Sequence, residues 1–129
     1  MQRHILLIDD EEDIREVVAL SLETVAGWRV TSAGSGREGI ELARKAMPDA
    51  VLLDVMMPGQ DGPATLRLLR SDEITARIPV IFLTAKVQSI ERERLQGAGA
   101  AGFLAKPFNP MTLANEVSEI LGWQPSAKE

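Results

Sequence analysis

The chain has 129 residues, of which 45% are hydrophobic and 26% charged, and its net charge is −5 at pH 7. This length and composition fit one globular domain and argue against a disordered chain. The acidic balance does not favour nucleic-acid binding, and the lack of cysteine excludes disulfides, thiolate metal sites and cysteine nucleophiles. The apolar runs are too short for a signal peptide or a membrane span, so we expect a cytoplasmic protein.

Apolar, strand-like runs alternate with helical patterns along the chain, beginning with a strand over residues 5–8. The helix that follows should end before Gly27, a residue suited to helix ends. Helical spacing predicts that its inward face carries Ile14, Val17, Val18, Ser21, Leu22 and Val25. A second strand over residues 28–33 leads into a second helix that ends at Pro48. This helix should turn three residues inward, namely Ile40, Ala43 and Met47.

The third run, residues 50–54, is apolar until it ends in Asp54. Behind it, Asp61 could cap a helix that has Pro63 in its first turn and ends near Ser71. Asp54 therefore stands at the end of a buried strand, which places a carboxylate at the rim of the predicted sheet.

A fourth strand over residues 79–84 ends in Thr84, and the helix predicted over residues 88–96 is mostly charged, so we expect it to be held loosely. The fifth strand, residues 101–105, leads into Lys106. The last helix should end before Gly122 and bury Leu113, Val117, Ile120 and Leu121. This series predicts an α/β fold with a doubly wound parallel sheet. In such a sheet the carboxyl ends of the strands share one crevice, where ligands bind.

The residues at these strand ends resemble the receiver domain of two-component response regulators. The matching motifs are Asp9-Asp10, Asp54 with Met57-Pro58 and Asp61-Gly62 behind it, Thr84-Ala85, and Lys106-Pro107. The resemblance implies a flavodoxin-like (βα)5 fold with strand order 2-1-3-4-5. It also implies a receiver domain over residues 1–122, with residues 123–129 as a tail or the start of a linker.

The resemblance implies a phosphoacceptor signalling domain, not a turnover enzyme. Asp54 would receive a phosphoryl group from a sensor histidine kinase or a histidine phosphotransfer protein, with Lys106 and Thr84 contacting the phosphoryl oxygens. The resemblance further implies that Thr84 and Phe103 form a switch, and that the bond before Pro107 is cis. A downstream protein partner would bind the face formed by helix 4, strand 5 and helix 5. We expect no nucleic-acid or membrane binding through this domain.

A phosphoryl donor approaching converging carboxylates requires a divalent cation, and Mg²⁺ prefers hard oxygen ligands. Asp10 and Asp54 are the natural direct ligands, whereas Asp9 could bind directly or through water. The resemblance adds the backbone carbonyl oxygen of Met56, and Mn²⁺ could substitute for Mg²⁺. The Met56 sulfur is not expected to bind, since soft sulfur suits Mg²⁺ poorly.

Each of these residues also has a structural interpretation when taken alone. The acids after the first strand could favour a helix N-terminus, Asp54 could belong to a turn, and Phe103 could be a core residue. A second functional class is a Mg²⁺-dependent phosphatase of the haloacid dehalogenase type, but its Asp-x-Asp motif is not matched, because Glu11 lies two residues after Asp9. A nucleotide-binding module is a third class, yet no glycine-rich phosphate loop follows the first strand.

Overall fold

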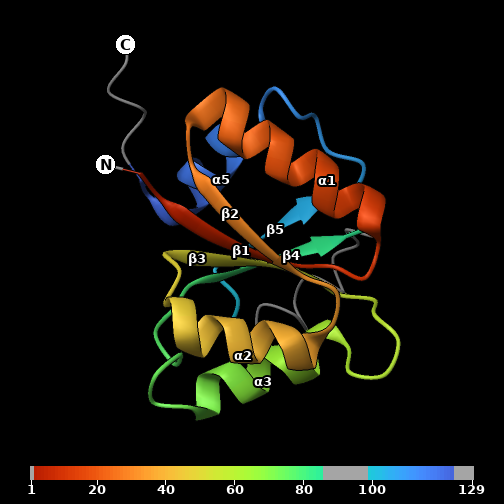
Figure 1. Cartoon of the computed structure of the whole chain (residues 1–129), viewed down its shortest axis with the longest axis vertical. Coiled ribbons are helices and arrows are strands. Elements are labelled where there is room, and N and C mark those ends of the chain that lie inside the picture. Colours follow the sequence, from red (N-terminus) through yellow and green to blue (C-terminus); the bar gives the residue numbers. More distant parts are fainter. Residues whose placement is uncertain (1, 86–98, 124–129) are drawn as a thin grey trace.

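The fold is known from a computed structural model, in which residues 2–85 and 99–123 are described. A five-stranded parallel sheet has the order β2-β1-β3-β4-β5 and carries helices on both faces (Figure 1). The strands are β1 (His4–Ile8), β2 (Arg29–Ala33), β3 (Ala50–Asp54), β4 (Val80–Thr84) and β5 (Gly102–Ala105). The helices are α1 (Glu12–Ser21) with its continuation η1 (Leu22–Ala26), α2 (Gly36–Ala46), α3 (Gly62–Ser71) and α5 (Leu113–Leu121). The predicted fold class and strand order are confirmed, whereas the helix predicted over residues 88–96 lies outside the described residues.

Two layers of core lie on opposite faces of the sheet, because successive strand residues point to opposite sides. In β1, Ile5 and Leu7 join the layer that includes Val18 of α1 and Val117 of α5. Leu6 and Ile8 join the layer on the other face, which α2 and α3 cover. The central strands are buried on both faces, which explains their continuous apolar runs.

The strand register brings the ends of the central strands to one edge of the sheet. Ile8 of β1 pairs with Leu53 of β3, so the next residue of each strand path, Asp9 and Asp54, emerges at the same level. Asp54 pairs in turn with Leu83 of β4. The parallel arrangement therefore gathers at this edge the side chains that follow different strands.

The helix boundaries follow the local chemistry of their ends. The Ser35 side chain caps α2 by accepting a hydrogen bond from the Glu38 N–H. The Asp61 carboxylate caps α3 by accepting one from the Ala64 N–H at 2.9 Å, as the sequence predicts. Gly27 ends the first helical segment with a φ of 72°, a backbone conformation that glycine adopts without strain.

Three predicted inward positions are wrong: Val17, Val25 and Met47 are exposed. Val17 lies about 100° around the helix from the buried Val18, at the border of the apolar stripe. Val25 lies in η1, a π-helix, whose wider turn changes the rotation between residues. Met47 follows the end of α2 with a left-handed φ of 50°, which turns its side chain away from the inward face of the helix.

The amino edge of the sheet carries an aromatic cluster. The rings of Trp28 and Trp123 meet edge to face with centroids 5.4 Å apart, and the Arg3 guanidinium lies 4.2 Å above the Trp123 ring. Trp123 lies one residue beyond the predicted domain end and packs on the folded chain. None of the described helices is long and apolar enough to cross a membrane.

Candidate functional site

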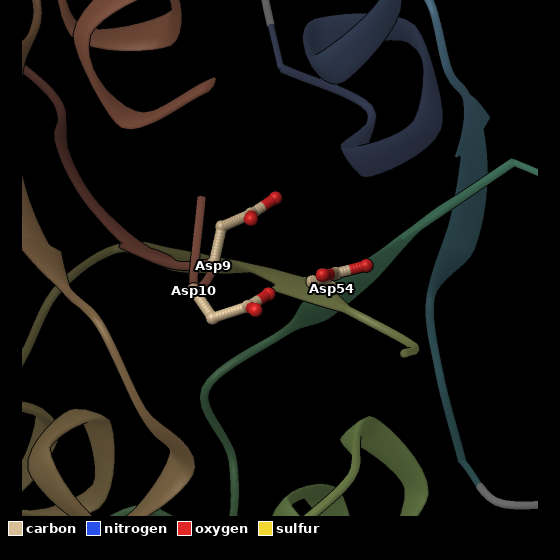
Figure 2. A group of neighbouring side chains, drawn as sticks. All are labelled: Asp9, Asp10 and Asp54. Carbon is tan, nitrogen blue, oxygen red and sulfur yellow. The ribbon is translucent and has the colours of Figure 1, made fainter. Parts of the chain in front are cut away.

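Three carboxylates converge at the carboxyl ends of β1 and β3. Asp9 directly follows β1 and is fully buried, while Asp54 is the last residue of β3 and only 5% exposed. Asp10 is exposed beside them. One oxygen from each carboxylate lies within 4.8 Å of the others, and Figure 2 shows the Asp9 and Asp10 side chains extending from the chain after β1 on the side where Asp54 lies. The structure thus brings together the three acids that the sequence predicts.

Lys106 places its positive charge among these acids. It directly follows β5, and its Nζ lies 2.8 Å from Asp9 Oδ2, 3.4 Å from Asp54 Oδ1 and 3.5 Å from Glu11 Oε1. Lys106 thus pairs with both buried acids, and the closer carboxylate is that of Asp9. The bond before Pro107 is cis, as the resemblance implies.

The backbone and its neighbours fix Asp9 in place. Its Oδ1 accepts a hydrogen bond from the Glu11 N–H at 2.9 Å, and its carbonyl oxygen accepts one from Arg15 Nη1 at 2.7 Å. Sequence reasoning missed Arg15, which anchors the loop before α1. No spacing in the sequence signals this contact, because it depends on how α1 turns back over the end of β1.

Burial and neighbouring charges change the ionisation of Asp54 and Lys106. Burial raises the pKa of the Asp54 carboxyl to about 6, the Asp9 charge adds to this rise, and Lys106 and the Met56 N–H oppose it. Burial acts to lower the pKa of Lys106, but the hydrogen bond and charge of Asp9 and the charge of Asp54 outweigh it, so this pKa is raised. With its pKa at about 6, Asp54 is therefore mainly ionised at neutral pH, beside a lysine whose raised pKa keeps it protonated there.

The loop behind Asp54 is packed closely on the strand end. The Met56 N–H donates to Asp54 Oδ1 at 3.3 Å, and the Gly62 N–H donates to the Val55 carbonyl oxygen at 3.0 Å. A methyl group on Gly62 would come within 3.0 Å of the Asp54 carbonyl oxygen, so the first turn of α3 requires glycine here. The Met56 side chain is 77% exposed and points away from the core, which leaves its backbone as the part of this residue at the site.

The predicted switch residues lie on β4, which pairs with β3, and on β5, which pairs with β4 at the edge of the sheet. Thr84 ends β4 and is 5% exposed. Phe103 on β5 is half-buried and packs on the core layer beneath α2 and α3, where its ring stacks nearly parallel to Phe82 with centroids 6.4 Å apart. Thr84 thus lies on the strand that pairs with the strand of Asp54, and Phe103 lies one strand farther out.

The donor set fits a hard divalent cation. All three clustered side chains offer carboxylate oxygens, and the exposed Asp10 leaves one side open to water. Mg²⁺ typically takes one or two protein carboxylates, keeps several waters and shares the substrate's phosphate. The Lys106 ammonium supplies one charge against three carboxylates, so the cluster retains a negative charge that a dication would balance.

Comparison with known proteins decides the family. The sequence profile described as the response regulator receiver domain matches residues 5–118. The chain belongs to this family. Receiver domains are signalling domains of two-component systems and not turnover enzymes, so the haloacid dehalogenase and nucleotide-binding alternatives are set aside.

Several curated relatives of this receiver domain are transcriptional regulators. The phosphate regulon transcriptional regulatory protein PhoB of Pseudomonas aeruginosa is 39% identical over 119 residues, which cover 91% of this chain and 51% of PhoB. The transcriptional regulatory protein CseB of Streptomyces coelicolor is 40% identical over 120 residues, which cover 93% of this chain and 50% of CseB. The chain thus spans about half the length of these relatives.

Solved structures give the same fold. The chemotaxis protein CheY4 of Vibrio cholerae superposes with a TM-score of 0.87 at 32% identity, covering 93% of this chain and 99% of CheY4. The receiver domain of a sensor histidine kinase from Pseudomonas aeruginosa, solved with a magnesium ion coordinated in its active site cleft, gives a TM-score of 0.83 at 32% identity. That match covers 95% of this chain and 99% of the other. Receiver domains bind Mg²⁺ at an acidic pocket and interact with histidine kinases or phosphotransfer proteins.

Proposed function

We propose that this receiver domain accepts a phosphoryl group on Asp54 from a sensor histidine kinase or a histidine phosphotransfer protein, in a Mg²⁺-dependent reaction in the cytoplasm. The observation that carries the proposal is the buried Asp54 carboxylate beside two other acids and 3.4 Å from the Lys106 ammonium. The domain is taken as residues 1–122, with residues 123–129 as a tail or the start of a linker.

In the transfer, an Asp54 carboxylate oxygen attacks the phosphorus of a phosphohistidine. The new O–P bond forms as the P–N bond breaks, and the imidazole keeps the electron pair, so that an aspartyl phosphate results. Phosphoryl transfer depends on in-line positioning and on stabilisation of charge. Lys106 provides a charge that can follow the phosphoryl oxygens, and the Thr84 hydroxyl provides a further hydrogen-bond donor.

Asp10, Asp54 and the Met56 carbonyl oxygen would hold Mg²⁺, or Mn²⁺ in its place, with Asp9 bound directly or through water. The bound ion would neutralise negative charge that otherwise repels the phosphoryl donor. Within the chain, Asp9 also holds Lys106 at 2.8 Å, so it positions the lysine that must turn to the phosphoryl group. We therefore expect Asp10→Ala to weaken metal binding more than Asp9→Ala.

Phosphorylation adds charge and three acceptor oxygens at Asp54. This change becomes a signal only if the domain has a second conformation that the phosphoryl group favours. We propose that Thr84 moves toward the phosphoryl group and that Phe103 turns into the space left behind. The output would be a downstream protein partner on the face that includes β5 and α5, together with the helix predicted over residues 88–96. No nucleic acid or membrane would be bound by this domain itself.

The proposal is tested by treating the purified chain with acetyl phosphate and Mg²⁺ and recording its intact mass. We expect one phosphoryl group per chain, none in excess chelator and none in Asp54→Asn. Asp61→Asn is the matched control, because Asp61 lies in the same loop but caps α3 instead of joining the cluster. Labelling of Asp54→Asn to the extent of the parent would place the acceptor elsewhere.

The switch is tested separately by NMR of the phosphorylated and free chains. Chemical shifts should change around Thr84 and Phe103 as well as around Asp54. Thr84→Ala should still take up a phosphoryl group but leave the Phe103 ring in one environment. Changes confined to the loop behind Asp54 in the parent would contradict the switch while leaving the phosphoacceptor in place.

A further inference from the structure

A polar pair lies behind the acid cluster that the transfer chemistry does not use. Gln60 Nε2 donates a hydrogen bond to Thr65 Oγ1 at 3.0 Å, and Thr65 Oγ1 donates one to the Asp61 carbonyl oxygen at 2.9 Å. Thr65 is fully buried, so its hydroxyl depends on these partners. The pair joins the loop behind Asp54 to the first turns of α3.

The start of α2 packs against the same two atoms, Gln60 Nε2 and Thr65 Oγ1. A methyl group built on Gly36, the first residue of α2, would come within 3.0 Å of both Thr65 Oγ1 and Gln60 Nε2. The backbone of α2 therefore lies directly against the bonded pair, and glycine leaves it room. Residues from the loop, from α3 and from α2 thus meet at one hydrogen bond.

The position of Gln60 gives this bond a consequence for the site. Two hydrogen bonds fix the ends of the loop over residues 55–61. At its start the Met56 N–H donates to Asp54 Oδ1, and at its end the Gly62 N–H donates to the Val55 carbonyl oxygen. Between these points the loop carries exposed residues at Met56, Pro58 and Gly59. Gln60 is half-buried and ties the far side of the loop to the body of the domain.

We propose that the Gln60–Thr65 hydrogen bond positions the loop of residues 55–61 for divalent metal binding, so that Gln60 and Thr65 are positioning residues for the metal site. The inference rests on the proposed function, because it takes the Met56 carbonyl oxygen as a metal ligand. When the bond is broken, the loop gains conformations in which this oxygen faces away from the cluster. The metal ion then binds only the fraction of chains whose loop is in the binding conformation. The apparent affinity for the metal is therefore weaker, although the filled site is unchanged.

Four variants test the Gln60–Thr65 hydrogen bond: three of them disrupt it and one keeps it. Gln60→Leu keeps the volume and removes the amide, whereas Thr65→Val keeps the shape and removes the hydroxyl. Gly36→Ala adds a methyl group that presses on both atoms, although alanine by itself favours a helix. Thr65→Ser keeps the hydroxyl and should behave like the parent. The matched control is Ser71→Ala, which removes a side-chain hydrogen bond to the Leu68 carbonyl at the far end of α3.

The first readout is Mn²⁺ affinity, measured by electron paramagnetic resonance on the metal-free full chain. Gln60→Leu, Thr65→Val and Gly36→Ala should each weaken binding by about three- to tenfold, as the loss of one supporting hydrogen bond does. The double variant of Gln60→Leu and Thr65→Val should bind no worse than either alone, since both break the same bond. Phosphorylation by acetyl phosphate should be slow at low Mg²⁺ and reach the parent's rate at saturating Mg²⁺.

Hydrogen exchange supplies a readout without metal. The Gly62 N–H should exchange faster in the three bond-breaking variants and at the parent's rate in Thr65→Ser and Ser71→Ala. Mn²⁺ affinities equal to the parent's in Gln60→Leu and Thr65→Val, or losses that add in the double variant, would overturn the inference while leaving the proposed function intact. A parent chain that binds no Mn²⁺ would overturn both.

Discussion

At the amino edge of the sheet, Trp28, Trp123 and Arg3 pack on one another, and the His4 ring lies 2.8 Å from Thr31 Oγ1. At the carboxyl edge, Asp9 and Asp54 are buried together, and the Lys106 ammonium is shared between them. The first arrangement stabilises the fold by itself. The second is electrostatically incomplete until a cation or phosphoryl group arrives, and such local conflicts are typical of functional sites.

The largest effect should come from removing the shared lysine. Lys106→Met leaves Asp9 and Asp54 buried without their cation, and breaking a buried ion pair costs about 3–5 kcal/mol. We expect this loss in the free energy of unfolding by urea near neutral pH in chelator. Millimolar Mg²⁺ should restore part of it, because the ion places positive charge on the same carboxylates. Lys45→Met, at the exposed end of α2, should change stability little under both conditions. A Lys106→Met loss that Mg²⁺ leaves unchanged would show that the cluster does not hold the ion.

Neutralising the acceptor should stabilise the metal-free chain in a pH-dependent way. The pKa of Asp54 in the folded chain, about 6, lies above the ordinary value of 3.8, so the folded state keeps a proton that the unfolded state has lost. Stability of the parent should therefore fall as the pH rises from about 4 to about 6. The stability of Asp54→Asn should lack this fall. Above about pH 6 its free energy of unfolding should exceed that of the parent by up to about 3 kcal/mol, at about 1.4 kcal/mol per pKa unit.

Asp13→Asn provides the control for this titration, since Asp13 is an exposed acid in the first turn of α1. It should change the free energy of unfolding by less than about 0.5 kcal/mol at either end of the range. An Asp54→Asn gain that is the same at about pH 4 and about pH 7 would mean that the burial of the Asp54 charge is not its cause.

A substitution at the amino edge should lower stability by an amount that depends on neither pH nor metal. Trp123→Ala removes the edge-to-face contact with Trp28 and the Arg3 stacking, and we expect a loss of about 2 kcal/mol for this half-buried ring. The measurement is urea unfolding followed by circular dichroism. Met111→Ala, an exposed apolar residue, should have a much smaller effect. A Trp123→Ala loss that disappears when Mg²⁺ is added would remove the distinction between the two edges.

The sequence predicted the fold and the acid cluster because each depends on short-range patterns. Apolar runs of strand length identify β1, β3 and β4, and the parallel topology then brings Asp9, Asp54 and Lys106 to one edge. Errors arose where the helix geometry departs from a regular period. Val25 in the π-helical turn and Met47 in a left-handed conformation are the examples.

Contacts between elements could not be read from the sequence. The Arg15 bond to the Asp9 carbonyl oxygen depends on how α1 turns back over the end of β1. The Gln60 bond depends on the close approach of α2 at Gly36, which no spacing in the sequence reveals. The preference of Lys106 for Asp9 over Asp54 likewise follows from distances of 2.8 Å and 3.4 Å that only the folded chain sets.

The central claim, that the crowded carboxylate of Asp54 is the phosphoacceptor, is tested most directly on the unaltered chain. After reaction with acetyl phosphate and Mg²⁺, borohydride reduction converts an aspartyl phosphate to homoserine, which peptide mass spectrometry locates. We predict homoserine at position 54, with aspartate retained at Asp9, Asp10 and Asp61. Homoserine at another position, or a phosphoryl group that survives on a serine or threonine, would contradict the assignment of the site.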